Sequence, residues 1–267
     1  KESIRSKLPP TATDDAPLLV VREGPVVRAI LNRPARRNAM NLALVERLDA
    51  LLAGLPDNNE VRVLVLAGAG GHFCAGGDIA GQGSGSLADG RERFRMTHEM
   101  VRLLVRCSKP SIAAVEGWAA GAGLSLALLC DSVVAGEGAK FSAPFGKVGL
   151  IADLGLLHTL PRRIGEGRAR QMLLYGEAME AKEALATGLV DRLAPDGGVL
   201  EAALERARLL AAAAPLPQQL TRQYLWRGLD EALDWEREAQ AALMTTEDHA
   251  EGRNAFLEKR APRFAGR

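Results

Sequence analysis

Residues 71–79 read GHFCAGGDI, and a second small-residue stretch, residues 117–123, reads GWAAGAG. The first follows residues 61–66, VRVLVL, a nearly continuous apolar run that is typical of a strand buried on both faces. The second opens the apolar run 124–129, LSLALL, which we expect to be a helix. Ligands of open α/β sheets bind at the carboxyl ends of the strands. The two stretches therefore indicate an α/β fold with a ligand site built from backbone.

The chemistry of such a site depends on which groups the two turns present. A dinucleotide fingerprint that starts at Gly68 requires glycine at position 73, where Phe73 stands, so the first turn disfavours a nicotinamide site. A helix that starts after the second turn exposes unpaired N–H groups with a partial positive charge, which suits an anion or an oxyanion. Both stretches are alternatively plain tight turns that need glycine. The small residues that flank both turns favour the functional interpretation.

Strand and helix patterns alternate outward from these turns. Residues 17–22 and 26–31 predict an opening hairpin, and Asn41 is expected to cap a helix with Leu44 and Leu48 on its apolar face. The alternation predicts crossover units and a largely parallel sheet. Beyond about residue 195 only helical patterns remain. We therefore divide the chain into a polar leader (1–16), an α/β core (17–197) and a helical region (198–267) that is expected to pack on a neighbouring copy.

Composition narrows the class of protein. The 267 residues carry a formal net charge of +1, and only 4% are aromatic, which argues against nucleic-acid and membrane-surface partners. No apolar run reaches the roughly 18 residues of a membrane span. Three widely spaced cysteines predict a reducing compartment, and the scattered histidines have no metal-site spacing. We expect a soluble, cytoplasmic protein without a metal.

Several stretches, in the right order along the chain, resemble the crotonase family, the enoyl-CoA hydratase/isomerase group. They are LNRP (31–34), NAMN (38–41), residues 73–79, residues 117–123 with Cys130-Asp131, GLIADLG (149–155) and AFLEKR (255–260). The match covers roughly residues 17–264. The resemblance implies an α/β spiral of ββα units with a C-terminal helical trimerisation region, and a homotrimer or hexamer.

The resemblance also implies how the substrate binds. The thioester carbonyl of a coenzyme A ester lies between the backbone N–H groups of Gly77 and Ala122, an oxyanion hole in which one donor contributes about 3–4 kcal/mol to transition-state stabilisation. Coenzyme A is part of the substrate, and no separate cofactor is implied. The residues expected to contact it are Arg36, Arg37, Ala75, Asp78, Ile79, Phe256 and Lys259. Phe256 is alternatively a core aromatic, and Lys259 a solvated charge.

The reaction follows from the side chains around this hole. Hydratases of the family use two glutamates, whose positions here are Ser125 and Phe145, so these two residues are expected to line a substrate pocket without carboxylates. Asp153 matches the catalytic aspartate of the phenylacetyl-type isomerases, to which residues 117–123 are also most similar. A single base suits a proton shift, and its apolar neighbours Leu150 and Leu154 are expected to raise its pKa. We predict an acyl-CoA isomerase that shifts a double bond of an enoyl-CoA, with Asp153 as the acid/base.

Other interpretations stay open at this point. The chain is alternatively an enoyl-CoA hydratase, another thioester enzyme of the hydrolase or aspartate-nucleophile type, or a catalytically silent acyl-CoA binder. Asp153 is alternatively an N-cap of the following helix. Cys74 is expected to be a buried filler, His98 a surface residue, and the Ser125 hydroxyl to face its own helix.

Overall fold

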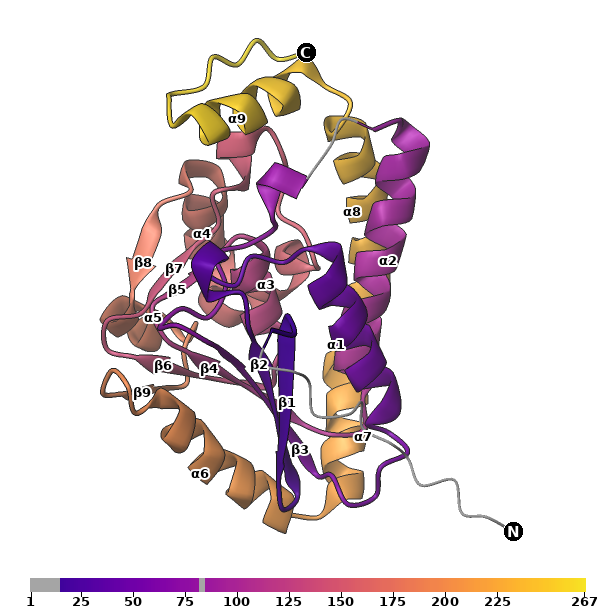
Figure 1. Cartoon of the computed structure of the whole chain (residues 1–267), viewed down its shortest axis with the longest axis vertical. Helices are drawn as coiled ribbons and strands as arrows, with labels where there is room; N and C mark the ends of the chain where they lie inside the picture. The colour runs from indigo at the N-terminus through magenta and orange to yellow at the C-terminus, as the bar shows by residue number, and fades with distance from the viewer. Residues whose placement is uncertain (1–14, 82–84) are drawn as a thin grey trace.

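A six-stranded sheet forms the centre of the computed structural model, which describes residues 15–81 and 85–267 (Figure 1). Its strand order is β1–β2–β3–β4–β6–β9, and only the β1–β2 pair is antiparallel. The strands are β1 (Leu18–Glu23), β2 (Val26–Leu31), β3 (Val63–Gly68), β4 (Ser111–Val115), β6 (Ser132–Gly136) and β9 (Arg192–Ala194). The predicted hairpin and the largely parallel sheet are confirmed.

A second, smaller sheet joins β5 (Trp118–Ala120), β7 (Lys140–Ser142) and β8 (Ala178–Glu180). Two isolated bridges, Cys74 to Ala119 and Met40 to Gly77, continue this sheet beyond β5. The chain passes from β4 through β5 into α3 (Ala122–Leu128), and from β6 through β7 into α4 (Leu156–Tyr175). These repeated ββα units confirm the predicted spiral, and they put the two glycine-rich turns into the same layer.

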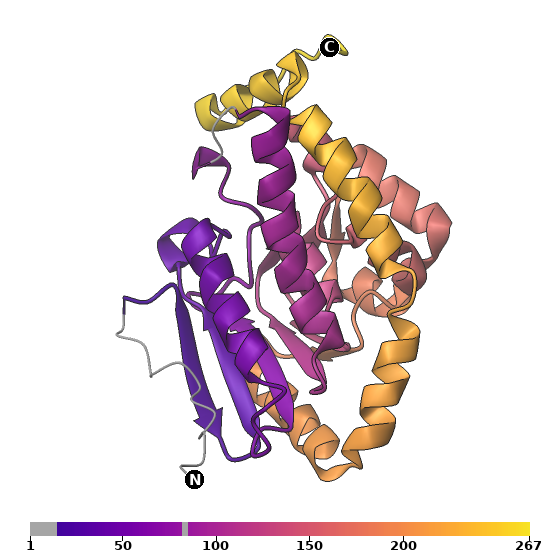
Figure 2. The ribbon, with the colours of Figure 1, turned by 90° about the vertical axis from the view of Figure 1, so that its right-hand side faces the viewer.

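Two helices cover one face of the large sheet. Asn41 caps α1 (Leu42–Gly54) by accepting the N–H of Leu44 at 3.1 Å, as predicted. Ser86 and Asp89 form a capping box at the start of α2 (Leu87–Arg106). Helix α8 (Leu229–Leu243) lies along α2 (Figures 1 and 2), and the two approach so closely that a Cβ at Gly90 would lie 3.0 Å from the Ala241 Cα.

The opposite face of the sheet is covered by α6 (Val199–Ala212), which contributes Val199, Ala203, Leu204 and Ala207 to a second apolar core (Figure 1). The helical region that we predicted from residue 198 therefore begins as part of the α/β core. The helices α7 (Pro215–Leu225), α8 and α9 (Glu247–Glu258) follow it. Helix α8 packs on α2 of the same chain, and packing of the helical tail on a neighbouring copy stays a prediction.

Several boundaries differ from the predictions for local reasons. The strands β5, β8 and β9 span three residues each, too few for a period to be read. Helix α4 is kinked at Gly165, whose φ is 77°. The short helices α5 (Ala181–Thr187), η1 (Pro34–Arg36), η2 (Ile79–Gly81) and η3 (Phe145–Val148) complete the fold.

Most of the predicted leader, residues 1–14, lies outside the described residues. In the part of the chain that the structure describes, no helix combines the length and apolar character of a membrane span.

A buried arginine attaches α7 to the core. Arg222 is 5% exposed, and its Nε donates to the Asp131 carboxylate at 2.7 and 2.8 Å. The guanidinium also donates to the backbone oxygens of Cys107 and Leu104, at the end of α2. Asp131 in turn accepts the N–H of Ser111 at 2.7 Å, so one ion pair joins α7, α2 and the start of β4.

Replacing Arg222 by methionine should destabilise the protein strongly. The change leaves a partly buried Asp131 carboxylate and two carbonyl groups without their donor, and breaking such a pair costs about 3–5 kcal/mol. The measurement is urea unfolding followed by circular dichroism. Arg168→Met is the matched control, since its pair with Glu183 is about half exposed on both sides and is worth less than about 1 kcal/mol. Equal losses for the two variants would contradict the prediction.

Candidate active site

The two glycine-rich turns touch through their backbones. The N–H of Ala120 donates to the Cys74 carbonyl at 3.0 Å, and the N–H of Met40 donates to the Gly76 carbonyl at 2.7 Å. Gly76 has a φ of 109°, and a Cβ there would lie 3.0 Å from the Ala120 oxygen and 3.7 Å from the Ala122 nitrogen. The contact therefore depends on glycine, and it brings the amides of the two turns to one place.

The N–H groups of Gly77 and Ala122 are left available by this arrangement. Ala122 is the first residue of α3, so its N–H has no acceptor within the helix. Gly77 is bridged to Met40 through the bonds of its two neighbours, which leave its own N–H unused. Neither amide donates a hydrogen bond within residues 15–81 and 85–267. Both residues line a cavity of about 460 Å³, so both donors are free for a ligand oxygen.

The second turn packs closely against the backbone of the first turn. Gly123 lies against the first turn, where a Cβ would be 2.2 Å from the Cys74 carbonyl oxygen. The Cys74 thiol is fully buried, and this burial raises its pKa to about 12. It stays protonated at neutral pH, and the prediction that Cys74 is a buried filler is confirmed.

Asp153 brings a carboxyl group to the same cavity. It lies in the loop that precedes α4, and the neighbouring Leu150 and Leu154 line the cavity with it. Its Oδ1 is buried and has no hydrogen-bond partner in the described chain. Burial raises the pKa of Asp153 well above its usual range, the Glu236 carboxylate raises it further, and the Arg93 guanidinium opposes both. A carboxyl group in this environment can both accept and donate a proton.

The alternative role of Asp153 as an N-cap is wrong. The N-cap of α4 is Gly155, with no capping side chain in its own loop. The N–H groups of Leu154 and Gly155 instead donate to Glu236 of α8, at 2.7 and 2.8 Å. The carboxyl of Asp153 is therefore not used in holding the helix start.

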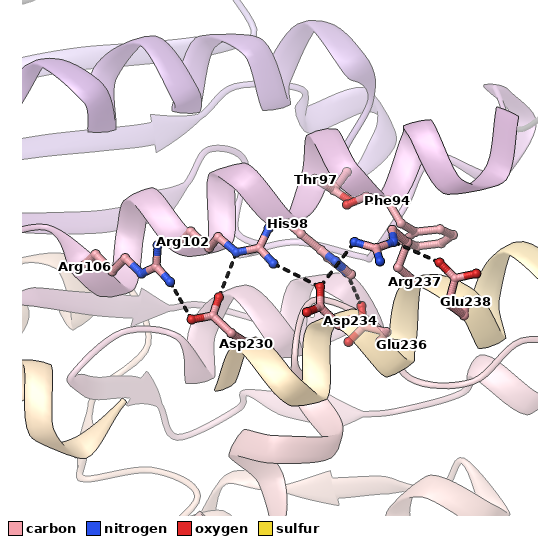
Figure 3. Close-up of polar contacts among 10 residues, drawn as sticks. All are labelled: Phe94, Thr97, His98, Arg102, Arg106, Asp230, Asp234, Glu236, Arg237 and Glu238. Carbon is pink, nitrogen blue, oxygen red and sulfur yellow. Dashed lines mark hydrogen bonds and ion pairs between the residues drawn. The ribbon is translucent and has the colours of Figure 1, made fainter. Parts of the chain in front are cut away.

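Glu236 and His98 are residues that the sequence reasoning missed. His98 was expected on the surface but is fully buried, and its Nε2 lies 2.7 Å from Glu236 Oε1 (Figure 3). The signal for Glu236 was available, because it shares one face of α8 with Leu229, Leu233 and Gln240, all of them buried. A charged residue within an apolar helical stripe indicates a buried polar partner.

The predicted coenzyme A contacts divide into two groups. Asp78 lines the cavity and pairs with Arg33 at 2.8 Å, and Ile79 follows it in η2. Ala75 donates its N–H to the Arg37 carbonyl at 2.9 Å, and the side chains of Arg37 and Arg36 are exposed beside this edge. These five residues therefore lie together around the first turn.

Phe256 and Lys259 lie apart from the cavity lining, at the end of α9 (Figure 1). Helix α9 approaches the first turn through Arg253, whose Nε donates to the Ile79 carbonyl at 3.4 Å. Phe256 is 57% exposed, so the alternative that it is a core aromatic is wrong. Contact of either residue with coenzyme A stays a prediction.

Ser125 and Phe145 are not among the described residues that line this cavity, and their contact with the substrate stays a prediction. The Ser125 hydroxyl is fully buried and donates to the Gly121 carbonyl at 3.2 Å, within its own helix as expected. The Phe145 ring packs against the same turn, 3.8 Å from the position of a Cβ at Gly121. Both residues therefore support the second turn.

Comparison with known proteins adds the following findings. The model of a family described as enoyl-CoA hydratase/isomerase matches residues 22–267. The chain is 39% identical to the 2,3-dehydroadipyl-CoA hydratase of Escherichia coli, over 94% of this chain and 99% of the relative. It is 37% identical to the 1,2-epoxyphenylacetyl-CoA isomerase of the same organism, over 91% and 95%. The crystal structure of an enoyl-CoA hydratase from Mycobacterium avium subsp. paratuberculosis superposes with a TM-score of 0.85 at 30% identity, covering 94% of this chain and 99% of that chain.

Substituting Gly123 by alanine should disrupt the contact between the two turns. The new methyl group would overlap the Cys74 carbonyl, and overpacking of this kind costs about 1–3 kcal/mol. The measurement is thermal unfolding together with binding of a nonreactive coenzyme A thioether, and both should weaken. Gly54→Ala is the control, because nothing lies within 4 Å of a Cβ there. A Gly123→Ala protein with unchanged stability and binding would contradict this account.

Proposed function

The chain belongs to the enoyl-CoA hydratase/isomerase family, and from that premise we propose that it shifts a double bond of an enoyl-CoA through an enolate. The amides of Gly77 and Ala122 hold the enolate oxygen, and Asp153 is the acid/base. The observation that carries the proposal is that Asp153, whose buried Oδ1 has no hydrogen-bond partner among the described residues, lines the same cavity as both free amides.

The proposed reaction needs one proton-transfer group. Asp153 removes a proton from C2 of a 3-enoyl thioester, and the electron pair of that C–H bond is delocalised into a dienolate. The negative charge that develops on the thioester oxygen is stabilised by the two N–H donors. The protonated Asp153 then returns the proton to C4, which gives the 2-enoyl isomer and restores the carboxylate. No atom is gained or lost.

Other carboxylates around the cavity are already engaged. Asp78 pairs with Arg33, Asp89 accepts the N–H of Ser86, and Glu92 pairs with Arg95. This leaves Asp153 as the candidate base, which favours a proton shift over the two-carboxylate addition of water. Hydration is the second candidate, and the 2,3-dehydroadipyl-CoA hydratase relative favours it. The isomerase relative favours the proton shift.

The proposal extends to how the substrate is held. The residues around the first turn (Arg36, Arg37, Ala75, Asp78 and Ile79) would bind coenzyme A, which enters as part of the substrate and makes a separate cofactor unnecessary. Phe256 and Lys259 would complete that site, and α7, with Leu216, Leu220 and Tyr224 exposed, would pack against further copies of the chain in the cytoplasm.

Incubation with coenzyme A thioesters in deuterated water should distinguish the candidate reactions. With a panel of 2-enoyl, 3-enoyl and aromatic thioesters, we expect deuterium in the acyl chain without addition of water, measured by mass spectrometry. Asp153→Asn should lower the rate by about 100-fold or more, because general acid–base catalysis contributes at least that much. The control is Asp234→Asn, an exposed carboxylate of α8. A hydroxyacyl product would establish hydration instead, and full isomerase activity in Asp153→Asn would overturn the assignment.

The pH dependence of the reaction should report Asp153. The group acts first as a base, so the free enzyme is active when Asp153 is ionised. Because burial and Glu236 raise its pKa, kcat/KM should fall on acidification at a pH well above the usual titration range of an aspartate. The measurement is kcat/KM for the best substrate of the panel across pH. Activity that stays constant down to the ordinary range of a carboxyl group would contradict the assigned environment.

A further inference from the structure

Glu236 occupies the centre of a buried hydrogen-bond network. Its side chain is 1% exposed, and its two oxygens accept the N–H groups of Leu154 and Gly155. Oε1 also lies 2.7 Å from Nε2 of His98, a fully buried residue of α2 (Figure 3). The two backbone N–H groups can only donate, and in the Nε2–H tautomer of His98 the imidazole donates as well, an arrangement that suits a carboxylate, which is purely an acceptor. A negative charge is therefore held inside the protein beside the candidate catalytic loop.

The backbone conformation of that loop explains why an anion is needed. Leu154 and Gly155 both adopt left-handed conformations, with φ of 51° and 74°. Successive N–H groups in such a segment point the same way and form a concave site for an anion. At Leu154 the conformation costs about 1–2 kcal/mol, because the residue carries a Cβ. The Glu236 carboxylate supplies the anion that offsets this strain.

Helix α8 also holds the other side of Asp153. One helical turn beyond Glu236, the Nε2 of Gln240 donates to the Ile151 carbonyl at 2.7 Å. Helix α8 therefore contacts the loop on both sides of Asp153, at Ile151 before it and at Leu154 and Gly155 after it. The carboxyl of Asp153 makes no such contact through Oδ1, so the loop orients it while leaving it free to react.

Three titratable or charged groups face Asp153 from the elements packed against it. Glu236 faces it from α8, Arg93 from α2 and the protonated Cys74 thiol from the first turn. After burial itself, the negative charge of Glu236 is what raises the pKa of Asp153 most, and Arg93 acts in the opposite direction. His98 contacts Glu236 and thereby fixes where this charge lies.

We propose that Glu236, oriented by His98, is the positioning residue of Asp153, and that it both fixes the loop and places a negative charge beside it. That Glu236 fixes the loop follows from its hydrogen bonds with the N–H groups of Leu154 and Gly155 and from its buried contact with His98. The role of Asp153 as the acid/base rests on the proposed function. The influence of Glu236 on Asp153 does not require turnover, and it is tested separately.

The other carboxylates of α8 supply matched controls. Asp230, Asp234 and Glu238 lie on the exposed side of the helix and pair with arginines (Figure 3). Glu238 is two residues from Glu236 and about half exposed. The substitution Glu238→Gln removes the same charge from the same helix without touching the loop.

The test is an infrared titration of Asp153 in the absence of substrate. The carbonyl band of the protonated Asp153 carboxyl is identified by its absence from Asp153→Asn and is followed against pH. In Glu236→Gln its midpoint should move to lower pH, because the neighbouring negative charge is gone, and in Glu238→Gln it should match the wild type. An unchanged midpoint in folded Glu236→Gln would overturn the electrostatic half of the proposal.

A second variant covers the case in which Glu236→Gln does not fold. Glu236→Asp keeps the charge but shortens its reach to the loop, so the Asp153 midpoint should stay high. The kcat of Glu236→Asp should fall by roughly 10- to 100-fold with little change in KM, as expected of a misplaced catalytic group. Full kcat in this variant would overturn the positioning half. Loss of the proposed isomerase reaction in the wild type leaves the infrared titration unaffected, so the two proposals fail separately.

Discussion

The contact between the backbone of Cys74 and the backbone at Gly123 is the constraint on which the rest of this structure depends. No side chain fits between the two turns, since a Cβ at Gly123 would lie 2.2 Å from the Cys74 oxygen. The bridge from Cys74 to Ala119 fixes the turns in register, and α3 must therefore begin at Ala122. The amide of Ala122 at the helix start and the amide of the bridge residue Gly77, both unpaired among the described residues, consequently line the same cavity. Backbone geometry alone makes this pair of donors, so it tolerates many changes in the side chains around it.

Buried charges attach the C-terminal helices to this frame. Arg222 of α7 pairs with Asp131, and Glu236 of α8 holds the loop of Asp153. A buried charge is costly unless it is paired, so each of these contacts fixes one arrangement of its helix against the core. Helix α8 therefore packs together with α2 and the loop that carries Asp153. The apolar side chains of α7, among them Leu216 and Leu220, remain on the surface.

The sequence predicted those features that local signals determine. The Asn41 cap, the opening hairpin and the two glycine turns each depend on a few neighbouring residues, and all are present. The resemblance to a known family singled out Asp153 as a candidate acid/base, and in the structure Asp153 lines the cavity. Contacts between segments that are far apart in the sequence could not be predicted. His98 carries no local sign that its partner is 138 residues away on α8, and the placement of Ser125 and Phe145 against the turn depends on packing.

The two amides depend on local backbone geometry, whereas the surroundings of Asp153 depend on contacts with a distant helix, and this difference matters for the chemistry. In the proposed reaction the two amides stabilise an enolate intermediate, and they do so through backbone groups rather than through side chains. The fate of an enolate depends instead on which proton donor stands beside it and on when that donor is ionised. In this chain both properties converge on the loop at Asp153, which α8 holds through Glu236 and Gln240. If the two amides act as proposed, a change in this loop and in its support from α8 would alter the reaction without disturbing the turns.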